Sequence, residues 1–362
     1  MDLFQTLDES SKLMVEEIKA PYLEALIHTA ENLIDDGSVF NEENTLSKET
    51  VEKLENLYKE VQLEEYSPDT IRQAMQLALL RGMKEDYIQP NHQMTPDSIG
   101  SLMAYLIEII AEPKGKIHLT DLSVGTGNLL LTVHHFLKQA AGREIALSGV
   151  DNDELMLSIA STNSTIQRTP INLLYQDALT NLLLPPADVM VSDLPIGFYP
   201  LEKQLTDYQT KFTDKNLKSY SHFMLIEQSF NYMKDGGYGF FLLPSNVFDD
   251  ENVSVLVKYL QDVGYIQGVI QLPREIFANE ESRKAIFIVQ KKGTNAKQMN
   301  DVLLSSAPDF KDFEAMKSFL GKIMEFNSEF CPNCGKNIKK VINRKKNFSK
   351  TIKSVKDILH GV

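Results

Sequence analysis

The regular alternation of strand-like and helix-like segments from residue 116 onward constrains the fold of this chain most. Strand patterns fall at 117–122, 145–150, 172–175, 188–191, 238–243, 266–272 and 285–290, and helical patterns fall between them at 128–140, 154–162, 221–233 and 253–263. Such alternation predicts an α/β fold, with a Rossmann-like, mostly parallel sheet that carries helices on both faces. In open sheets of this kind, ligands bind beyond the carboxyl ends of the strands.

The first ninety residues have a different pattern and predict an acidic helical domain. Apolar residues such as Leu23 and Leu26 recur there at helical spacing. The pair Ser67–Pro68 marks the start of a further helix, expected over residues 71–81. We therefore expect three segments, namely a helical domain at 1–90, an α/β domain at 91–330 and a basic tail at 331–362.

The net charge of −13 is unevenly distributed along the chain. Residues 1–90 carry 20 acidic and 8 basic side chains, whereas residues 331–362 carry 9 basic and one acidic. A protein that grips duplex DNA needs several cations facing phosphates, so this balance disfavours tight, unaided DNA binding. With two cysteines, no apolar run of ~20 residues and no signal-peptide pattern, we expect a cytoplasmic protein without a membrane partner.

A glycine turn, 121–128, follows the first predicted strand. Gly125 and Gly127 allow a tight turn, and the helix starts at once, so that its N-terminal amides would face a ligand. A dinucleotide-binding turn has a third glycine where Leu130 stands here, and the lysine of a Walker loop is absent. NAD, FAD and ATP are therefore disfavoured. An aspartate also follows each of the next three strands, at positions 151, 177 and 193.

This succession resembles the motifs of class I methyltransferases, which bind S-adenosylmethionine. The resemblance implies that Asp121 lies near the methionine end of that cofactor, that Asp151 accepts the ribose hydroxyls, and that Asp177 binds the adenine amino group. Each aspartate alone is also an ordinary strand-end residue. On this basis the expected cofactor-binding residues are Thr95, Pro96, Asp121, Ser123, Gly125, Thr126, Gly127, Asn128, Leu129, Asp151, Asn152, Asp177, Ala178 and Asp193. No metal site is expected.

Residues 70–292 resemble one branch of that class, the N6-adenine DNA methyltransferases. The similarity is to the modification subunits of type I restriction systems and, more closely, to the YtxK-type proteins. Residues 92–100 resemble the Thr-Pro motif of the family, in which a loop caps the methionine end of the cofactor. Thr95 as N-cap and Pro96 in the first turn would also serve as a plain helix start. Residues 221–248 and 269–291 resemble later, architectural segments.

The catalytic motif of these enzymes is Asn/Asp/Ser-Pro-Pro-aromatic, after the fourth strand. The first side chain and the next carbonyl accept the two N–H bonds of the adenine amine, and the aromatic ring stacks on the extruded base. This chain has an isoleucine, Ile196, at the aromatic position, so Phe198 or Tyr199 would have to replace the stacking ring. The expected catalytic residues are Asp193, Leu194, Pro195, Phe198 and Tyr199.

Three functions remain open at this point. The first is an S-adenosylmethionine-dependent N-methyltransferase of the N6-adenine type, acting on DNA or RNA, although no segment after residue 290 has room for a target-recognition domain. The second is a methyltransferase for a protein or small-molecule nitrogen, because the same two acceptors suit a glutamine amide. The third is a regulatory or scaffold protein that binds the cofactor without turnover and docks a protein partner through its acidic helices.

Two further segments have both a functional and a plain interpretation. Residues 201–218 contain four lysines and form either a substrate lid or an ordinary solvated loop. Cys331 and Cys334 have the spacing of a zinc knuckle, with His360 as a third candidate ligand, but structural zinc needs four ligands. Reduced thiols are the favoured interpretation. The basic run at 336–356 would contact nucleic acid, an acidic partner or the acidic helices.

Overall fold

The computed structural model describes residues 2–41, 45–89, 94–201, 207–212, 218–294, 296–299 and 302–330. The helices are α1 (Leu3–Ile18), α2 (Tyr22–Ile34), α3 (Lys48–Tyr58), α4 (Pro68–Glu85), α5 (Asp97–Leu106), α6 (Asn128–Ala141), α7 (Glu154–Ile166), α8 (Ser221–Tyr232), α9 (Val253–Val263) and α10 (Phe313–Phe330). The strands are β1 (Ile117–Asp121), β2 (Ile145–Asp151), β3 (Asn172–Tyr175), β4 (Ala187–Asp193), β5 (Met233–Pro244), β6 (Gly264–Gln271), β7 (Lys284–Lys291) and β8 (Leu303–Ser306). Within these ranges, no helix combines the length and apolar character that a membrane crossing requires.

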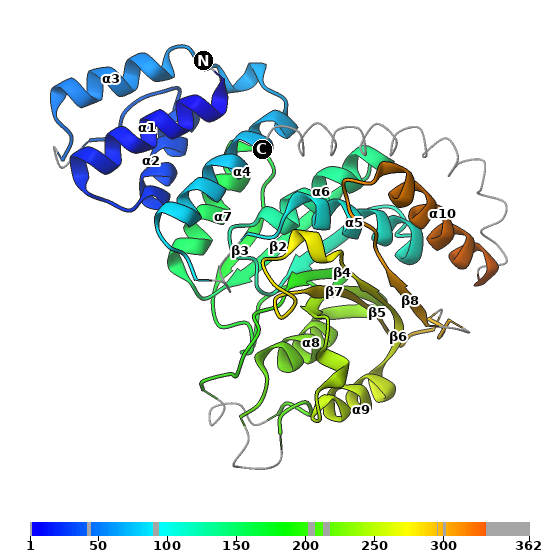
Figure 1. The fold of residues 1–362 in the computed structure, drawn as a ribbon. Helices are drawn as coiled ribbons and strands as arrows, with labels where there is room; N and C mark the ends of the chain where they lie inside the picture. Colours follow the sequence, from blue (N-terminus) through cyan, green and yellow to red (C-terminus); the bar gives the residue numbers. More distant parts are fainter. Residues whose placement is uncertain are drawn as a thin grey trace. The chain divides into compact units, whose positions relative to one another are not determined.

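The strands form one mixed sheet in the order β3-β2-β1-β4-β5-β7-β6-β8 (Figure 1). Strand β4 pairs in parallel with β1 and β5, whereas β7 pairs antiparallel with β5 and β6. The predicted Rossmann-like α/β sheet is confirmed. Because β1, β4 and β5 run in the same direction, their carboxyl ends at Asp121, Asp193 and Pro244 lie along one edge of the sheet.

Several elements are longer than the sequence pattern predicts. Helix α4 begins at Pro68 as predicted, because the Ser67 hydroxyl accepts a hydrogen bond from the Thr70 amide at 3.1 Å, but it continues to Glu85. Strand β5 begins at Met233 rather than at 238, since the Gly-Gly segment is absorbed into the strand through a register shift against β4. Strand β8 and helix α10 have no counterpart among the predicted elements.

The Thr-Pro segment starts a helix, but in a different way from the one predicted. Helix α5 begins at Asp97, and Pro96 occupies the N-cap position with no side-chain cap hydrogen bond. The interpretation of Thr95 as an N-cap is therefore wrong. Proline fixes the φ angle needed for helix entry, so the helix starts without a capping hydroxyl.

The chain divides into two compact units. The first contains residues up to 95 together with 124–131 and 149–176, and the second contains 96–123, 132–148 and the residues from 177 onward. The first unit therefore combines the N-terminal helices with α7, which the sequence places in the α/β segment. The domain boundaries predicted at 90 and 330 stay predictions.

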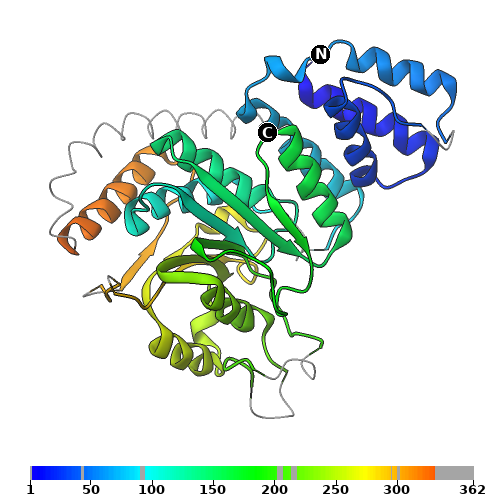
Figure 2. The same cartoon turned by 180° about the vertical axis from the view of Figure 1, so that it is seen from behind.

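Helix α7 completes the hydrophobic core of the first unit. Its residues Met156, Ile159 and Ile166 are buried in the same cluster as Leu23 and Leu26 of α2. Figures 1 and 2 show α7 beside α2 and α4 from both sides. The N-terminal helices thus bury part of their apolar surface against a helix from a distant part of the sequence.

The same helix supports the glycine turn from its other face. The Asn163 side-chain amide donates a hydrogen bond to the Thr126 carbonyl at 3.2 Å. Gly127 lies so close that an added Cβ would approach the Ala160 Cβ to 3.3 Å. Because α7 contacts both the helical core and the turn, changes in the packing of that core can reach the turn through one rigid element.

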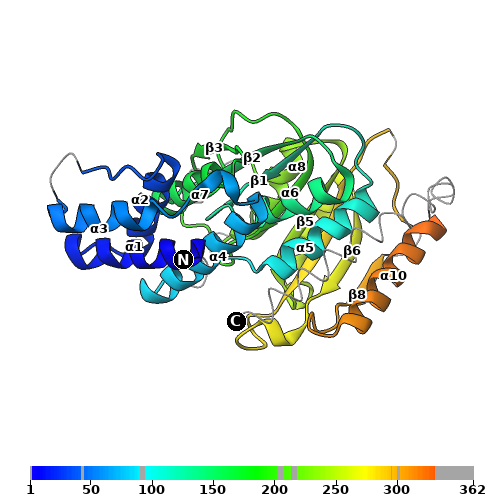
Figure 3. The ribbon, with the colours of Figure 1, turned by 90° about the horizontal axis from the view of Figure 1, so that it is seen from above.

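In the second unit, helices cover both faces of the sheet. Figures 1 and 3 show α5 and α10 together on one side, and Figure 2 shows α8 and α9 on the opposite side. Helix α10 is held by hydrogen bonds from the Tyr105 hydroxyl to the Leu320 carbonyl at 2.9 Å and from the Asn327 side-chain amide to the Ile109 carbonyl at 2.7 Å and the Glu112 carboxylate at 3.2 Å. The apolar end of β5 is fully buried between these layers.

We expect Ile159→Ala to destabilise the protein by about 2–5 kcal/mol, because it opens a cavity in the core shared by α7 and the N-terminal helices. Urea unfolding followed by circular dichroism measures the loss. The neighbouring Ser158 is exposed on the same helix, so Ser158→Ala should change the free energy of unfolding by less than about 0.5 kcal/mol. An equal loss of unfolding free energy in the two variants would contradict the conclusion that α7 completes the hydrophobic core of the first unit.

Candidate functional site

The glycine turn and Asp151 are held together by backbone hydrogen bonds in the first unit. Gly125 and Gly127 have φ angles of +51° and +76°, which favour glycine. The Gly125 amide donates to Asp151 Oδ2 at 2.8 Å, and the Asp153 amide donates to Asp151 Oδ1 at 2.9 Å. These two bonds fix the orientation of the Asp151 carboxylate next to the turn.

The two glycines differ in their surroundings. A Cβ at Gly127 would press on α7, whereas a Cβ at Gly125 would meet no atom within 4 Å. The turn thus leaves open space directly beside the Asp151 carboxylate. Backbone amides, a carboxylate and free space together suit a ribose diol, and this is the chemistry that the predicted cofactor would present here.

The other predicted cofactor residues of the first unit have different surroundings. The Asn128 amide donates to the Thr95 carbonyl at 2.8 Å, so this pair fixes the loop to the start of α6. Thr126 and Leu129 are buried, and Asn152 is exposed. Their predicted contacts with the cofactor stay predictions.

In the second unit, hydrogen bonds join the carboxyl ends of β1 and β4. The buried carboxylate of Asp121 accepts hydrogen bonds from the Ser192 hydroxyl at 2.5 Å and from the Ser123 amide at 2.9 Å. The Ser123 hydroxyl lies 2.6 Å from that of Ser192 and donates to the Asp193 carbonyl at 3.3 Å. Ser192 is absent from the predicted site. Its position directly before Asp193 is the only sequence signal for this role.

The structure distinguishes between the two rings that were expected to replace the missing aromatic. The Tyr199 hydroxyl donates to Asp177 Oδ2 at 2.6 Å, and the side chain is 9% exposed. Burial, together with that hydrogen bond, raises the pKa of Tyr199. Phe198 is 55% exposed and stacks on Tyr220, with ring centroids 5.2 Å apart and an interplanar angle of 17°. Phe198 therefore presents an open ring face, whereas Tyr199 is anchored.

Asp177 and Ala178 begin the loop that follows β3. Besides accepting the Tyr199 hydroxyl, Asp177 accepts a hydrogen bond from the Leu179 amide at 2.9 Å. The Ala178 carbonyl accepts a hydrogen bond from the Gln228 side chain of α8 at 2.8 Å. Asp177 is thus tied to the catalytic-motif loop through Tyr199, a link that the sequence does not predict.

Asp193 forms an ion pair with Lys284, the first residue of β7. Strand β5 lies between β4 and β7, with Asp193 opposite Leu242 and Pro244 opposite Lys284, so the lysine reaches over the end of β5. Leu194 is buried and offers its carbonyl rather than its side chain, and Pro195 is half-buried. Lys284 was not predicted, because nothing in the sequence places it next to residue 193.

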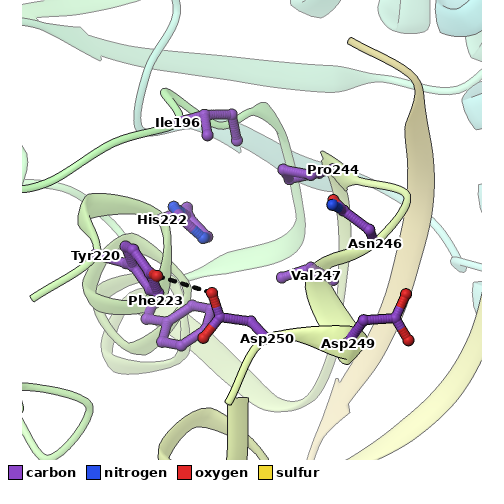
Figure 4. Close-up of a pocket in the computed structure, with 9 residues that line it drawn as sticks. All are labelled: Ile196, Tyr220, His222, Phe223, Pro244, Asn246, Val247, Asp249 and Asp250. Carbon is purple, nitrogen blue, oxygen red and sulfur yellow. Dashed lines mark hydrogen bonds between the residues drawn. The ribbon is translucent and has the colours of Figure 1, made fainter. Parts of the chain in front are cut away.

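A pocket of about 280 Å³ opens beside the catalytic motif (Figure 4). It is lined by Ile196, Tyr220, His222, Phe223, Pro244, Asn246, Val247, Asp249 and Asp250. The Tyr220 hydroxyl donates to Asp250 Oδ2 at 2.7 Å. Burial lowers the pKa of His222 to about 4, despite the opposing attraction of Asp250. The pocket lies at the ends of β4 and β5, where ligands of open α/β sheets bind.

Comparisons with known proteins agree with this arrangement. Residues 1–83 match the model of the YtxK N-terminal helical domain, and residues 90–353 match that of the N-6 DNA methylase family. The chain belongs to the N-6 DNA methylase family. It is therefore an S-adenosylmethionine-dependent methyltransferase, and S-adenosylmethionine is its cofactor.

Individual relatives are similar to this N-6 DNA methylase over most of its length. The uncharacterized protein YtxK of Bacillus subtilis (strain 168) is 31% identical over 324 residues, which cover 90% of this chain and 96% of that protein. A protein of Listeria monocytogenes described as a class I S-adenosylmethionine-dependent methyltransferase is 38% identical, with a TM-score of 0.82 over 90% of this chain and 98% of that one.

A more distant structural match supports the fold alone. The methyltransferase subunit of a type I restriction-modification system from Streptococcus thermophilus has a TM-score of 0.58 at 18% identity, over 89% of this chain and 74% of that chain.

Two predictions concern residues that lie outside the described part of the chain. The candidate zinc ligands Cys331, Cys334 and His360 are among these residues, as are 202–206 and 213–217 of the predicted lid.

His222 should make the methylase sensitive to acid. Its pKa is about 4 in the folded protein and near 6.5 when unfolded, so the unfolded chain takes up the proton first as the pH falls. The stability contributed by neutral His222 is complete above pH 6.5 and is lost between about 6.5 and 4. The loss should reach about 2–3 kcal/mol. Urea unfolding across this range should show that the free energy of unfolding depends less steeply on pH in His222→Phe than in the wild type. The same pH dependence in both proteins would contradict the lowered pKa of His222.

Proposed function

We propose that this methylase transfers a methyl group to the exocyclic amino nitrogen of adenine in a nucleic acid, with Asp193 and the Leu194 carbonyl as the acceptors that orient the amine. The main support is the position of Asp193, which stands at the carboxyl end of β4 next to a pocket that begins at Ile196. The membership of the N-6 DNA methylase family gives the same acceptor chemistry.

The proposed chemistry depends on geometry rather than on a strong base. The adenine amine is a poor nucleophile because its lone pair is delocalised into the ring. Two acceptors on its N–H bonds favour a pyramidal nitrogen, whose lone pair is then directed at the methyl carbon. S-adenosylmethionine, when bound, supplies that methyl group on a sulfonium. The nitrogen–carbon bond forms as the carbon–sulfur bond breaks, and the proton lost from nitrogen passes to solvent.

Lys284 has a specific part in this proposal, as a positioning residue. Its ammonium forms an ion pair with the Asp193 carboxylate and holds that carboxylate in place as a hydrogen-bond acceptor. The related family motifs allow asparagine, aspartate or serine at this position. A lysine partner suits the aspartate, because the charge of a half-buried carboxylate is then balanced.

The acidic character of the chain bears on the nucleic-acid substrate. A net charge of −13 gives weak attraction for phosphates, so binding of DNA or RNA should be loose or should depend on a partner protein. A glutamine amide has the same two N–H bonds as the adenine amine. A glutamine side chain in a protein is therefore the alternative acceptor, and methyl transfer to protein would contradict this proposal.

For the cofactor, we propose that the open space at Gly125 and the Asp151 carboxylate receive S-adenosylmethionine. Gly125→Ala should weaken its binding at least tenfold, since the new Cβ would occupy that space. Isothermal titration calorimetry with S-adenosylmethionine measures the change. Gly115 provides a matched control, because it also has a positive φ, +66°, and open space at the Cβ position.

Both alanine variants should lose a similar stability, about 1 kcal/mol, from the strained backbone. Gly115→Ala should nevertheless bind S-adenosylmethionine like the wild type. Equal loss of affinity in both variants would show that the effect is one of stability, and normal affinity in Gly125→Ala would contradict the proposed position of the cofactor.

Asp193→Ala should lower kcat for methyl transfer at least a hundredfold, and Lys284→Met roughly tenfold or more, with cofactor affinity retained in Lys284→Met. Transfer of labelled methyl groups to single-stranded DNA, RNA and protein extract identifies the acceptor and gives the rates. Lys234 of β5 and Asp188 of β4 form another ion pair, at 2.8 Å, near the start of β4 and so at the opposite end of that strand from Asp193. Lys234→Met should therefore leave kcat within about twofold.

Two results would contradict the proposal. Label found in protein alone would exclude adenine as the acceptor. Full activity of Asp193→Ala on nucleic acid would exclude the proposed role of this carboxylate.

A further inference from the structure

His222 has a buried hydrogen-bonding atom with no partner. The side chain is 4% exposed, and among the described residues its Nδ1 has no hydrogen-bond partner. Leaving such an atom unsatisfied costs about 1–3 kcal/mol, so unpaired buried polar atoms are rare in folded proteins. His222 lines the pocket beside the catalytic motif, as Figure 4 shows. Nδ1 itself has almost no accessible surface, so a ligand in that pocket would become its partner only when the imidazole turns toward the pocket.

The imidazole ring packs against aromatic neighbours. His222 stacks on Tyr220 with centroids 5.1 Å apart at 23°, and Tyr220 stacks in turn on Phe198. Phe223 contacts the edge of the stack, with its centroid 4.8 Å from that of His222. The Tyr220 hydroxyl is anchored on Asp250. The pocket wall is thus a preorganised stack of rings, contributed mainly by the start of α8.

The remaining lining restricts the chemistry of an occupant. Ile196, Phe223, Pro244 and Val247 are apolar, two aspartates are present, and neither lysine nor arginine is among the described residues that line the pocket. Phosphate and carboxylate groups would find no counter-charge among these residues. A volume of about 280 Å³ is slightly below the usual range for drug-sized ligands, ~300–1,000 Å³, so it suits a single flat group rather than a whole nucleotide.

We propose that this pocket seats the acceptor as an uncharged heteroaromatic base, and that His222 turns toward the base and donates a hydrogen bond from Nδ1 to a ring nitrogen. The inference rests on the proposed function, which assigns both N–H bonds of the amine to Asp193 and Leu194. The base then has only ring-nitrogen acceptors left, so His222 must be the donor. The apolar lining favours a base over a glutamine amide, because an amide has little apolar surface to bury.

This assignment gives His222 the recognition role that the motif itself lacks. Ile196 stands at the aromatic position of the family motif and contributes only apolar surface to the pocket. The histidine contributes both a hydrogen bond, which selects the polar edge of the base, and a ring that belongs to the stack. His222 is thus a specificity-determining residue of the acceptor site, whereas cofactor binding does not involve it.

A binding experiment tests the contact without turnover. The imidazole nitrogens of the ¹⁵N-labelled full chain are observed by long-range ¹H–¹⁵N spectroscopy during titration with 2′-deoxyadenosine, in the presence of S-adenosylhomocysteine. The His222 signals are assigned from their loss in His222→Phe. They should shift as 2′-deoxyadenosine is added, while those of buried His134 stay unchanged. Shifts caused by an N-acetylglutamine amide but not by 2′-deoxyadenosine would overturn the proposal.

A kinetic experiment tests the role of the contact in transfer. His222→Phe keeps a ring in the stack but removes both nitrogens, so kcat/KM for an adenine-containing oligonucleotide should fall roughly ten- to a hundredfold. Affinity for S-adenosylmethionine should be unchanged. His222→Asn, which restores a donor near Nδ1, should recover part of the loss. His134→Phe removes another buried histidine and should retain wild-type kcat/KM.

The outcomes separate this inference from the proposed function. If the wild type transfers methyl groups to the oligonucleotide and His222→Phe is as active, the role of His222 is excluded while the proposed function stands. If the wild type binds S-adenosylmethionine but labels no nucleic acid, the proposed function fails. Loss of cofactor affinity in His222→Phe, in proportion to its loss of activity, would also overturn the role of His222 in acceptor recognition.

Discussion

The carboxylate of Asp121 is buried at the end of β1, where it accepts hydrogen bonds from the Ser192 hydroxyl and the Ser123 amide. A buried carboxylate without such partners would cost several kcal/mol, so these bonds hold the ends of β1 and β4 in register. Asp193 follows Ser192 directly, and its carbonyl accepts the Ser123 hydroxyl. The predicted catalytic motif thus begins directly after a residue that these hydrogen bonds hold in place.

The residues around the predicted catalytic motif differ from the motif of the family. Ile196 stands at the aromatic position of the motif, and the Tyr199 hydroxyl donates a hydrogen bond to Asp177. Ring surface is supplied instead by Phe198, Tyr220 and His222, which form a continuous stack. A stack drawn from two separate segments is rigid because each ring is confined by the next. Such rigidity would lower the entropy lost on binding of the proposed flat acceptor.

The first unit connects the N-terminal helices to the cofactor turn through α7. One face of this helix completes the core around α2, and the other supports Thr126 and Gly127. An added Cβ at Gly127 would crowd Ala160, and the positive φ angle would strain any other residue there. Gly125, by contrast, borders open space. The two glycines of one turn thus serve different purposes, a distinction that their spacing does not reveal.

The sequence alone determined the α/β sheet, the family and the cofactor, because hydrophobic periodicity and the glycine turn are local patterns that survive in one dimension. It also located Asp193 and the departure at Ile196. Only the tertiary structure decided what surrounds them. Lys284 reaches Asp193, Tyr199 reaches Asp177, and His222 lines the pocket, because the sheet order places β7 beside β5 and the start of α8 next to the motif loop. Contacts between distant segments depend on strand order and side-chain direction, which single-sequence patterns do not specify.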